Sequence, residues 1–174
     1  MRKTVKNVAT VIIAVALMLI IAAISPQIIL PTGSLVAPLA GIIGISALLT
    51  LGIPLAILII VIGLVIMYLQ GTANDEVFVT ILVTLIVVAW LRNRQSSPVS
   101  HQQLILFGIV AGILTFVLME LSLLVAGWFF DGQWSTGLAF VRLGLSSSVL
   151  AALLYGILVA PITIAWRKLN QIIS

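Results

Sequence analysis

The sequence has no cysteine and very little charge. Its 174 residues include eight Lys or Arg, four Asp or Glu and a single His. Without cysteine the chain forms no disulfide and offers no thiolate as a nucleophile or metal ligand, and cysteine usage says nothing about the redox compartment. The basic residues are scattered rather than clustered into a groove or patch, so we expect no binding to nucleic acid.

The scarcity of ionisable residues also argues against an enzyme. Membrane phosphotransferases need clustered acids for divalent metals, zinc proteases need a set of His and Glu, and intramembrane aspartyl proteases need two Asp in their spans. The sequence contains none of these sets, and its only histidine, His101, falls in a loop remote from the serine run 146–148. We therefore expect no catalytic residue, no metal site and no cofactor.

Apolar residues are what the sequence has in excess. They make up 63% of the chain, and the mean hydropathy is +1.38, which is typical of an integral membrane protein. A span takes about 20 apolar residues, so the length allows about six spans. Backbone groups in a bilayer must be satisfied inside helices or a closed barrel, and these runs lack the alternation of barrel strands. We predict an all-α fold without strands and one transmembrane domain over residues 1–174.

Six apolar segments predict six membrane-spanning helices. They are residues 8–25, two helices within 34–70, and then 77–90, 104–130 and 135–166. The long second run is divided near Gly52, because Pro54 lacks an amide hydrogen and restricts the residue before it. A basic start followed by an apolar run also resembles a signal peptide, but this run exceeds the usual length of about 7 to 15 residues, so we expect it to be retained as a span.

The basic residues predict the orientation. With six spans, both termini and the loop after the fourth span share one side, and seven of the eight basic residues fall there: Arg2, Lys3, Lys6, Arg92, Arg94, Arg167 and Lys168. Because basic residues near span ends are retained in the cytoplasm, both termini are expected to be cytoplasmic. Trp90 and Trp166 are expected at the inner interface and Trp128 and Trp134 at the outer one.

Two charged residues interrupt the last two spans. At a rise of 1.5 Å per residue, Glu120 and Arg142 each lie roughly 12 to 16 Å from the turn between these spans, so their depths nearly match. A charge at that depth is costly unless it meets protein, water or an opposite charge. The favoured interpretation is a charge pair that locks the two helices together. The alternatives are a neutral Glu120 with Arg142 snorkelling to the surface, or contacts to a partner or ligand.

Four further residues are candidates for helix packing. Gly108 and Gly112 have the small-xxx-small spacing that lets helices approach closely, more often within one chain than between two. Ser146 starts a run of three serines, whose hydroxyls in an apolar helix usually bond to their own backbone, with a polar pocket as the alternative. Pro161 predicts a kink in the last span.

The order of these features resembles that of the MreD family of bacterial rod-shape proteins. The likeness covers Pro38 in "APLAGIIGISALL", Gly63 and Gly71 in "VIGLVIMYLQGTANDEVF", the basic loop "WLRNR", Glu120 in "LMELSLL" and Pro161 in "APITIAWRKL". The resemblance implies a non-enzymatic scaffold of the bacterial cytoplasmic membrane. It further implies binding to an MreC-like membrane protein and, through it, to the cell-wall synthesis machinery of RodA-type polymerase and penicillin-binding transpeptidase.

A second resemblance is to the substrate-binding S-components of energy-coupling-factor vitamin transporters, which are six-helix proteins of about this size. The stretch "PQIILPTGSLVAPLAGIIGISALL" is similar to their outer loop and second span. This alternative implies a transporter ATPase module as partner and a small vitamin bound near Glu120, Arg142, Trp128 and Trp134. The first span has no clear pair of alanines at the Ala-xxx-Ala coupling spacing, so the scaffold is favoured.

Overall fold

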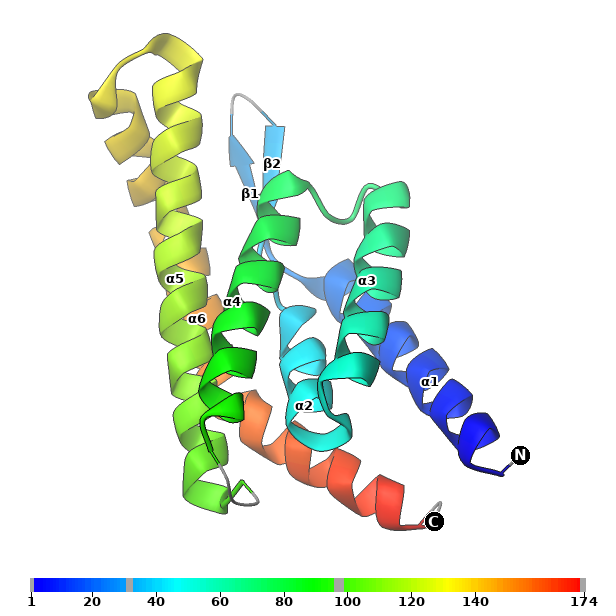
Figure 1. Cartoon of the computed structure of the whole chain (residues 1–174). Coiled ribbons are helices and arrows are strands. Elements are labelled where there is room, and N and C mark those ends of the chain that lie inside the picture. The colour runs from blue at the N-terminus through cyan, green and yellow to red at the C-terminus, as the bar shows by residue number, and fades with distance from the viewer. Residues whose placement is uncertain (1, 31–32, 96–98, 173–174) are drawn as a thin grey trace.

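The computed structural model describes residues 2–30, 33–95 and 99–172, which form six helices and one β-hairpin (Figure 1). The helices are α1 (Arg2–Ile24), α2 (Gly41–Leu51), α3 (Ile53–Leu69), α4 (Asp75–Asn93), α5 (His101–Asp131) and α6 (Trp134–Ile172). Strands β1 (Gln27–Leu30) and β2 (Gly33–Val36) pair antiparallel. The prediction of a helical fold with six helices is confirmed, whereas the expectation that the chain has no strands is wrong.

Three helical segments are long and apolar enough to cross a membrane, namely Lys6–Ile24, His101–Asp131 and Trp134–Leu169. Helices α2 and α3 are also apolar but shorter. The 11 residues of α2 rise only about 16 Å, roughly half the thickness of a hydrocarbon core. Length and composition therefore support three of the six expected spans.

The clearest departure from the predicted elements lies between α1 and α2. A helix was expected to begin near residue 34, but residues 33–36 form β2 and the helix begins at Gly41. The amide of Ala37 extends the hairpin by donating to the Pro26 carbonyl at 2.9 Å. Pro38 keeps the residue before it extended, which delays the helix. A short apolar run does not by itself distinguish a strand from a helix.

The break between α2 and α3 falls where the sequence predicts it. Gly52 has a φ of 87°, a conformation that residues with a side chain rarely adopt. Pro54 follows in the first turn of α3, where its missing amide hydrogen is not needed. The chain therefore reverses sharply, and α2 and α3 pack against each other.

The helices alternate in direction, so the chain has two distinct ends (Figure 1). The two termini and the start of α5 lie at one of them, which we call the terminal end. The β-hairpin and the turns from α3 to α4 and from α5 to α6 lie at the other, which we call the hairpin end. A shared side for both termini is what the distribution of basic residues predicts.

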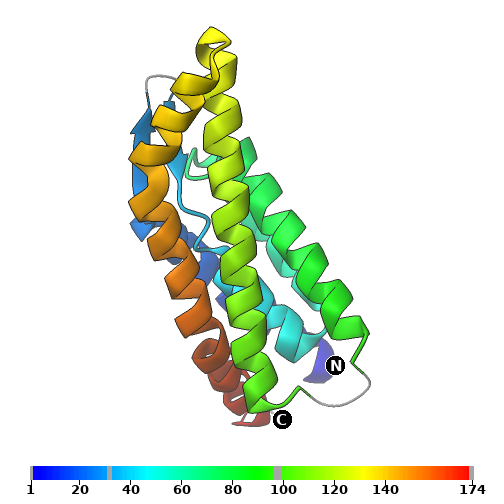
Figure 2. The same ribbon diagram turned by 90° about the vertical axis from the view of Figure 1, so that its left-hand side faces the viewer.

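Helices α5 and α6 form an antiparallel pair with the most extensive contact among the described elements (Figure 2). Gly112 packs so closely on the carbonyl of Ala152 that a side chain there would overlap it. Nearer the turn, a Cβ on Gly127 would lie 2.5 Å from the Cα of Gly137. The turn closes at Gly132, whose φ of 74° is the left-handed conformation favoured after a helix. Glycine at these places lets the two backbones touch.

Tyr155 joins the middle of α6 to the segment before α2. Its side chain is fully buried, and its hydroxyl donates to the carbonyl of Pro38 at 2.6 Å. Gly41 lies against this hydroxyl, with no room for a side chain. Residues 41–49 of α2 are all buried, so α2 is the central helix and Tyr155 anchors its start.

Helix α6 changes direction along its length (Figure 1). Its last part turns away from α5 and runs across the terminal end of the molecule. Pro161 lies inside the helix and lacks the amide that would bond to the carbonyl four residues earlier, which is a common cause of such a bend. The bend lies in the region where the sequence predicts a kink.

We expect Gly112→Ala to lower the thermal midpoint of unfolding in detergent. The added methyl group would overlap the Ala152 carbonyl, and overpacking of this kind costs about 1–3 kcal/mol. Gly156→Ala is the matched control, because a Cβ at Gly156 meets no atom within 4 Å and alanine is the better helix former. Equal midpoints for the two variants would contradict the close contact between α5 and α6.

We expect Tyr155→Phe to destabilise the fold without changing its helix content. The substitution removes the donor to the Pro38 carbonyl, and losing one partner of a buried hydrogen bond costs about 1–3 kcal/mol. Tyr68→Phe is the control, because Tyr68 is the only other tyrosine and is exposed. Thermal unfolding followed by circular dichroism measures both. A midpoint no lower than that of Tyr68→Phe would contradict this anchoring role.

Candidate functional site

Glu120 is the only acidic residue in the described part of the chain whose carboxyl oxygens are buried without a hydrogen-bond partner. Buried polar groups are nearly always hydrogen-bonded, so an exception calls for an explanation. An acid in an apolar helix is also costly when it is not paired. We therefore take the surroundings of Glu120 as the candidate site.

Helix α5 places Glu120 beside its contact with α6. Met119 and Leu123 are fully buried between the helices, whereas Glu120 is half-buried. One turn earlier, on the same face, lies Phe116. Phe116 lines an apolar cavity of about 440 Å³, which we call the α5–α6 groove. It is lined by Ile105, Ile109, Ile113, Phe116, Val149, Ala152, Leu153, Gly156 and Ile157. Glu120 therefore lies just beyond the groove, one turn nearer the hairpin end than Phe116.

Arg142 lies near the level of Glu120 but is not bonded to it. The antiparallel register set by the glycine contacts places Glu120 opposite Gly144, within one turn of Arg142. Neither carboxyl oxygen of Glu120 has a hydrogen-bond partner, and Arg142 is exposed. The reason is the direction of the side chain: Gly144 faces inward, and a residue two positions earlier points about 200° round the helix. The structure therefore shows no hydrogen bond in the predicted charge pair of Glu120 and Arg142.

Arg142 nevertheless lies on the same side of the α5 and α6 helix pair as the α5–α6 groove. It precedes Val149, which lines the groove, by seven residues, and residues seven apart share a helix face. The groove, Glu120 and the exposed Arg142 guanidinium therefore follow one another along a single side of α5 and α6, with the Glu120 carboxyl oxygens buried beneath the surface. We call this surface the α5–α6 face.

The candidate packing residues differ in whether they lie between helices. Gly108 and Gly112 both approach the backbone of α6, so their spacing serves contact within the chain. Ser146 is exposed and does not pack between helices. Ser148 is buried instead, and its hydroxyl donates to the carbonyl of Gly144 at 3.1 Å. Sequence spacing alone did not show which of the three serines faces inward.

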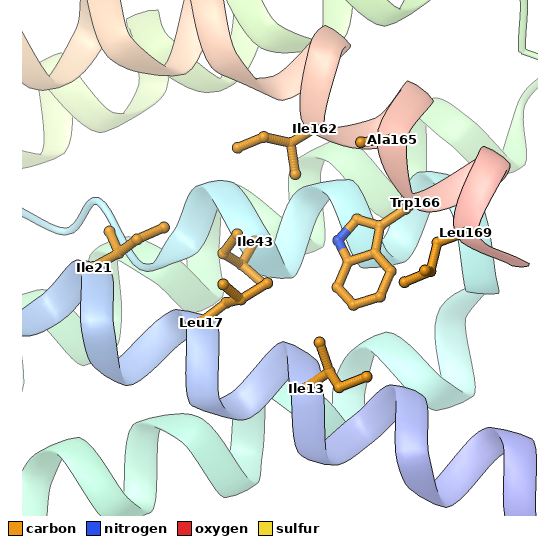
Figure 3. A pocket seen from close by; sticks show the side chains of 8 residues that line it. All are labelled: Ile13, Leu17, Ile21, Ile43, Ile162, Ala165, Trp166 and Leu169. Carbon is orange, nitrogen blue, oxygen red and sulfur yellow. The ribbon is translucent and has the colours of Figure 1, made fainter.

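The tryptophans do not all lie at the surface. Trp128 and Trp134 are exposed at the hairpin end and stack with their ring centroids 5.8 Å apart. Trp90 is also exposed, and the Arg94 guanidinium lies 3.8 Å from the centre of its ring. Trp166 differs, because only 4% of it is exposed and its ring points into a second cavity (Figure 3). Trp166 was expected at the membrane interface, but its ring is buried within the protein.

None of the four cavities described in this structure gathers the residues of the vitamin-site alternative. The α5–α6 groove and the cavity at Trp166 are lined by apolar side chains. A third cavity, at the terminal end, is lined by residues 48–54 together with Arg92, Asn93 and Gln95, and a fourth lies between α3 and the start of α4. Glu120, Arg142, Trp128 and Trp134 line none of these four cavities.

The α5–α6 face is suited to recognition of another helix. It combines an apolar groove with a carboxyl group whose buried oxygens have no hydrogen-bond partner in the described part of the chain, and polar side chains between apolar helices commonly form interhelical hydrogen bonds. The described residues include no group of three or more His, Cys, Asp or Glu that could hold a metal ion. Comparisons with protein-family models, curated proteins and solved structures find no match for this chain. Its function is therefore inferred from its own geometry.

Because Glu120 and Arg142 are not hydrogen-bonded to each other, we expect their substitutions to affect stability independently. In a double-mutant cycle of Glu120→Gln and Arg142→Leu, the coupling free energy should be below about 0.5 kcal/mol. Equilibrium unfolding of the four proteins in detergent gives this value. A coupling above about 1 kcal/mol would instead show that the charge pair forms in the detergent-solubilised protein.

Proposed function

We propose that this chain is a non-catalytic integral membrane scaffold whose α5–α6 face receives a transmembrane helix of a partner protein. Within that class, we propose that it is the MreD-type subunit of the bacterial rod-shape and cell-wall elongation complex. The partner is then an MreC-like protein, and the location is the bacterial cytoplasmic membrane with both termini in the cytoplasm. The order of features that resembles the MreD family supports this assignment.

The observation that carries the proposal is the state of the Glu120 carboxyl group. Both of its oxygens are buried and lack a partner among the described residues, and an unsatisfied buried polar group costs about 1–3 kcal/mol. Both oxygens are shielded from the surface of the chain alone, so docking requires the carboxyl group to turn outwards, where a hydrogen bond donated by a partner side chain removes this cost. The chain with its partner helix in place is then more stable than the chain alone, which is the expected property of a docking site.

The groove next to Glu120 fits an apolar helix. Its walls are the exposed side chains of Ile109 and Ile113 on α5 and of Leu153 and Ile157 on α6. Gly156 leaves open space between them, since a Cβ there would meet nothing within 4 Å. Small residues of this kind let a neighbouring helix approach closely. The tight packing of α5 on α6 holds the two walls at a constant separation.

The vitamin-transporter alternative lacks comparable support. It requires a polar cavity that brings Glu120 and Arg142 together with Trp128 and Trp134. Arg142 is exposed, and the two tryptophan rings stack on each other at the surface. The scaffold is therefore the function that we propose.

We expect Glu120→Leu to weaken partner binding about tenfold while leaving the isolated chain as stable as before or more stable. Leucine cannot accept the partner's hydrogen bond, but it also removes the unsatisfied group, and such replacements are often neutral or stabilising. The measurement is affinity purification of the tagged protein from native membranes, with quantification of the MreC-like protein. Loss of that hydrogen bond should reduce recovery about tenfold, if the bond contributes about 1–2 kcal/mol.

Glu76→Leu is the matched control, because Glu76 is also a half-buried glutamate but lies on α4, away from the α5–α6 face. It should leave partner recovery unchanged. Full recovery with Glu120→Leu would contradict docking at this site. Recovery of a transporter ATPase module by the wild-type chain, or tight binding of a vitamin by the purified protein, would replace the scaffold by the transporter alternative.

A further inference from the structure

Arg142 is a cation without a partner on an apolar helix. It is the only Lys or Arg between Arg94 and Arg167, and it falls within the segment Trp134–Leu169, which is long and apolar enough to cross a membrane. Its side chain is exposed and forms no hydrogen bond, ion pair or ring contact with the described residues. A charged side chain inside a span is costly unless an opposite charge, water or another protein meets it.

No carboxylate of the described chain is placed to neutralise Arg142. Glu120 lies near its level, but the Glu120 oxygens are buried and have no hydrogen-bond partner. Asp131, in the turn between α5 and α6, accepts a hydrogen bond from the amide of Gln133 at 2.9 Å. The other two acids are in the first turn of α4, and both termini lie at the opposite, terminal end of the molecule (Figure 1). The guanidinium therefore needs an anion from outside the chain.

The depth of Arg142 favours an anion on a neighbouring helix over a lipid phosphate. Arg142 follows Trp134, whose exposed ring is expected at the membrane interface, by about 12 Å along α6. An extended arginine side chain covers only roughly half of that distance. The guanidinium therefore stays below the lipid phosphates, at a depth where helices meet.

A helix that lies in the α5–α6 groove also passes over Arg142. Val149 lines this groove, and Gly156 leaves the open space in it. Arg142, Val149 and Gly156 follow one another at heptad spacing, so they share one face of α6 with a drift of only about 20° per heptad. A helix packed on Gly156 and aligned with α6 therefore meets Arg142 about 21 Å further towards the hairpin end.

We infer that the partner helix carries an acidic residue that pairs with Arg142. This acid lies about two heptads from the residue that packs on Gly156. A carboxylate there neutralises the guanidinium and accepts two of its hydrogen bonds at once. The inference rests on the proposed function, since it specifies the partner of the same α5–α6 face. It adds selectivity, because a helix without the acid leaves Arg142 unpaired in apolar surroundings.

Designed transmembrane peptides test this inference. Each peptide is an apolar helix with a leucine to pack on Gly156 and, two heptads away, either Glu or Gln to meet Arg142. A dansyl group at the end nearest Arg142 accepts fluorescence energy from the exposed Trp128 and Trp134 of the chain. In phosphatidylcholine vesicles, the Glu peptide should bind about tenfold more tightly than the Gln peptide, which is the scale of a good polar contact between helices.

Two variants of the chain assign this preference to Arg142. Arg142→Leu should lose the preference for Glu over Gln, while continued binding of the Gln peptide shows that the groove is intact. Lys168→Leu is the matched control, because Lys168 is an exposed cation near the other end of the same helix. It should keep the preference. A third peptide, with Glu one heptad nearer the Gly156 contact, should bind no better than its Gln counterpart, because Val149 faces that position.

The inference is overturned if the Glu and Gln peptides bind the wild-type chain equally, or if Arg142→Leu keeps the preference for Glu. Equal binding, together with a phosphatidylglycerol that native mass spectrometry finds on the wild-type chain but not on Arg142→Leu, would assign Arg142 to a lipid phosphate. These outcomes leave the scaffold proposal standing, since a helix still docks in the groove. If neither peptide binds, docking of a helix on the α5–α6 face fails, and this inference fails with it.

Discussion

The close contact between α5 and α6 is the constraint on which the rest of the structure depends. At Gly112 and Gly127 the two helices meet backbone to backbone, so no flexible side chain can absorb a change in their distance. This contact sets the register of the pair, and the register sets the levels of Glu120 and Arg142. It also holds the walls of the α5–α6 groove apart by a constant distance. The groove that we propose as a docking surface is therefore already formed in the chain alone.

Helix α6 connects this pair to the remaining helices. Tyr155 bonds to the carbonyl of Pro38 and so fixes the start of the buried helix α2. Beyond it, the last part of α6 bends away from α5 (Figure 1), and the Trp166 ring on this part faces Ile13 and Leu17 of α1 across a cavity (Figure 3). The same helix thereby contributes to two apolar grooves. The α5–α6 groove is followed by Glu120, and we propose that it receives a partner helix, whereas the cavity at Trp166 is lined by apolar side chains.

The residues of the candidate site could be found from the sequence, but their relationship could not. An acid and a guanidinium at similar depth in adjacent apolar helices are rare enough to attract attention without a structure. Whether they bond depends on which way each side chain points. Glu120 lies beside the helix contact and Arg142 points away from it, and depth along a helix contains no information on this rotation. The direction of the Trp166 ring could not be predicted either. Its position near a helix end predicts a ring at the membrane interface, but the ring is buried against the other helices.

By itself, the sequence determined the helical class of the protein, the number of helices, the reversal at Gly52 and the shared end of the two termini. These follow from hydropathy, from the backbone freedom of glycine and the restriction imposed by proline, and from the placement of charge, which are properties of short segments. Only the tertiary structure decided that the stretch before α2 is a β-hairpin, that Ser148 rather than Ser146 faces inward, and that Glu120 has no hydrogen-bond partner among the described residues. Each of these depends on which distant segment lies alongside, and that is settled by packing over the whole chain.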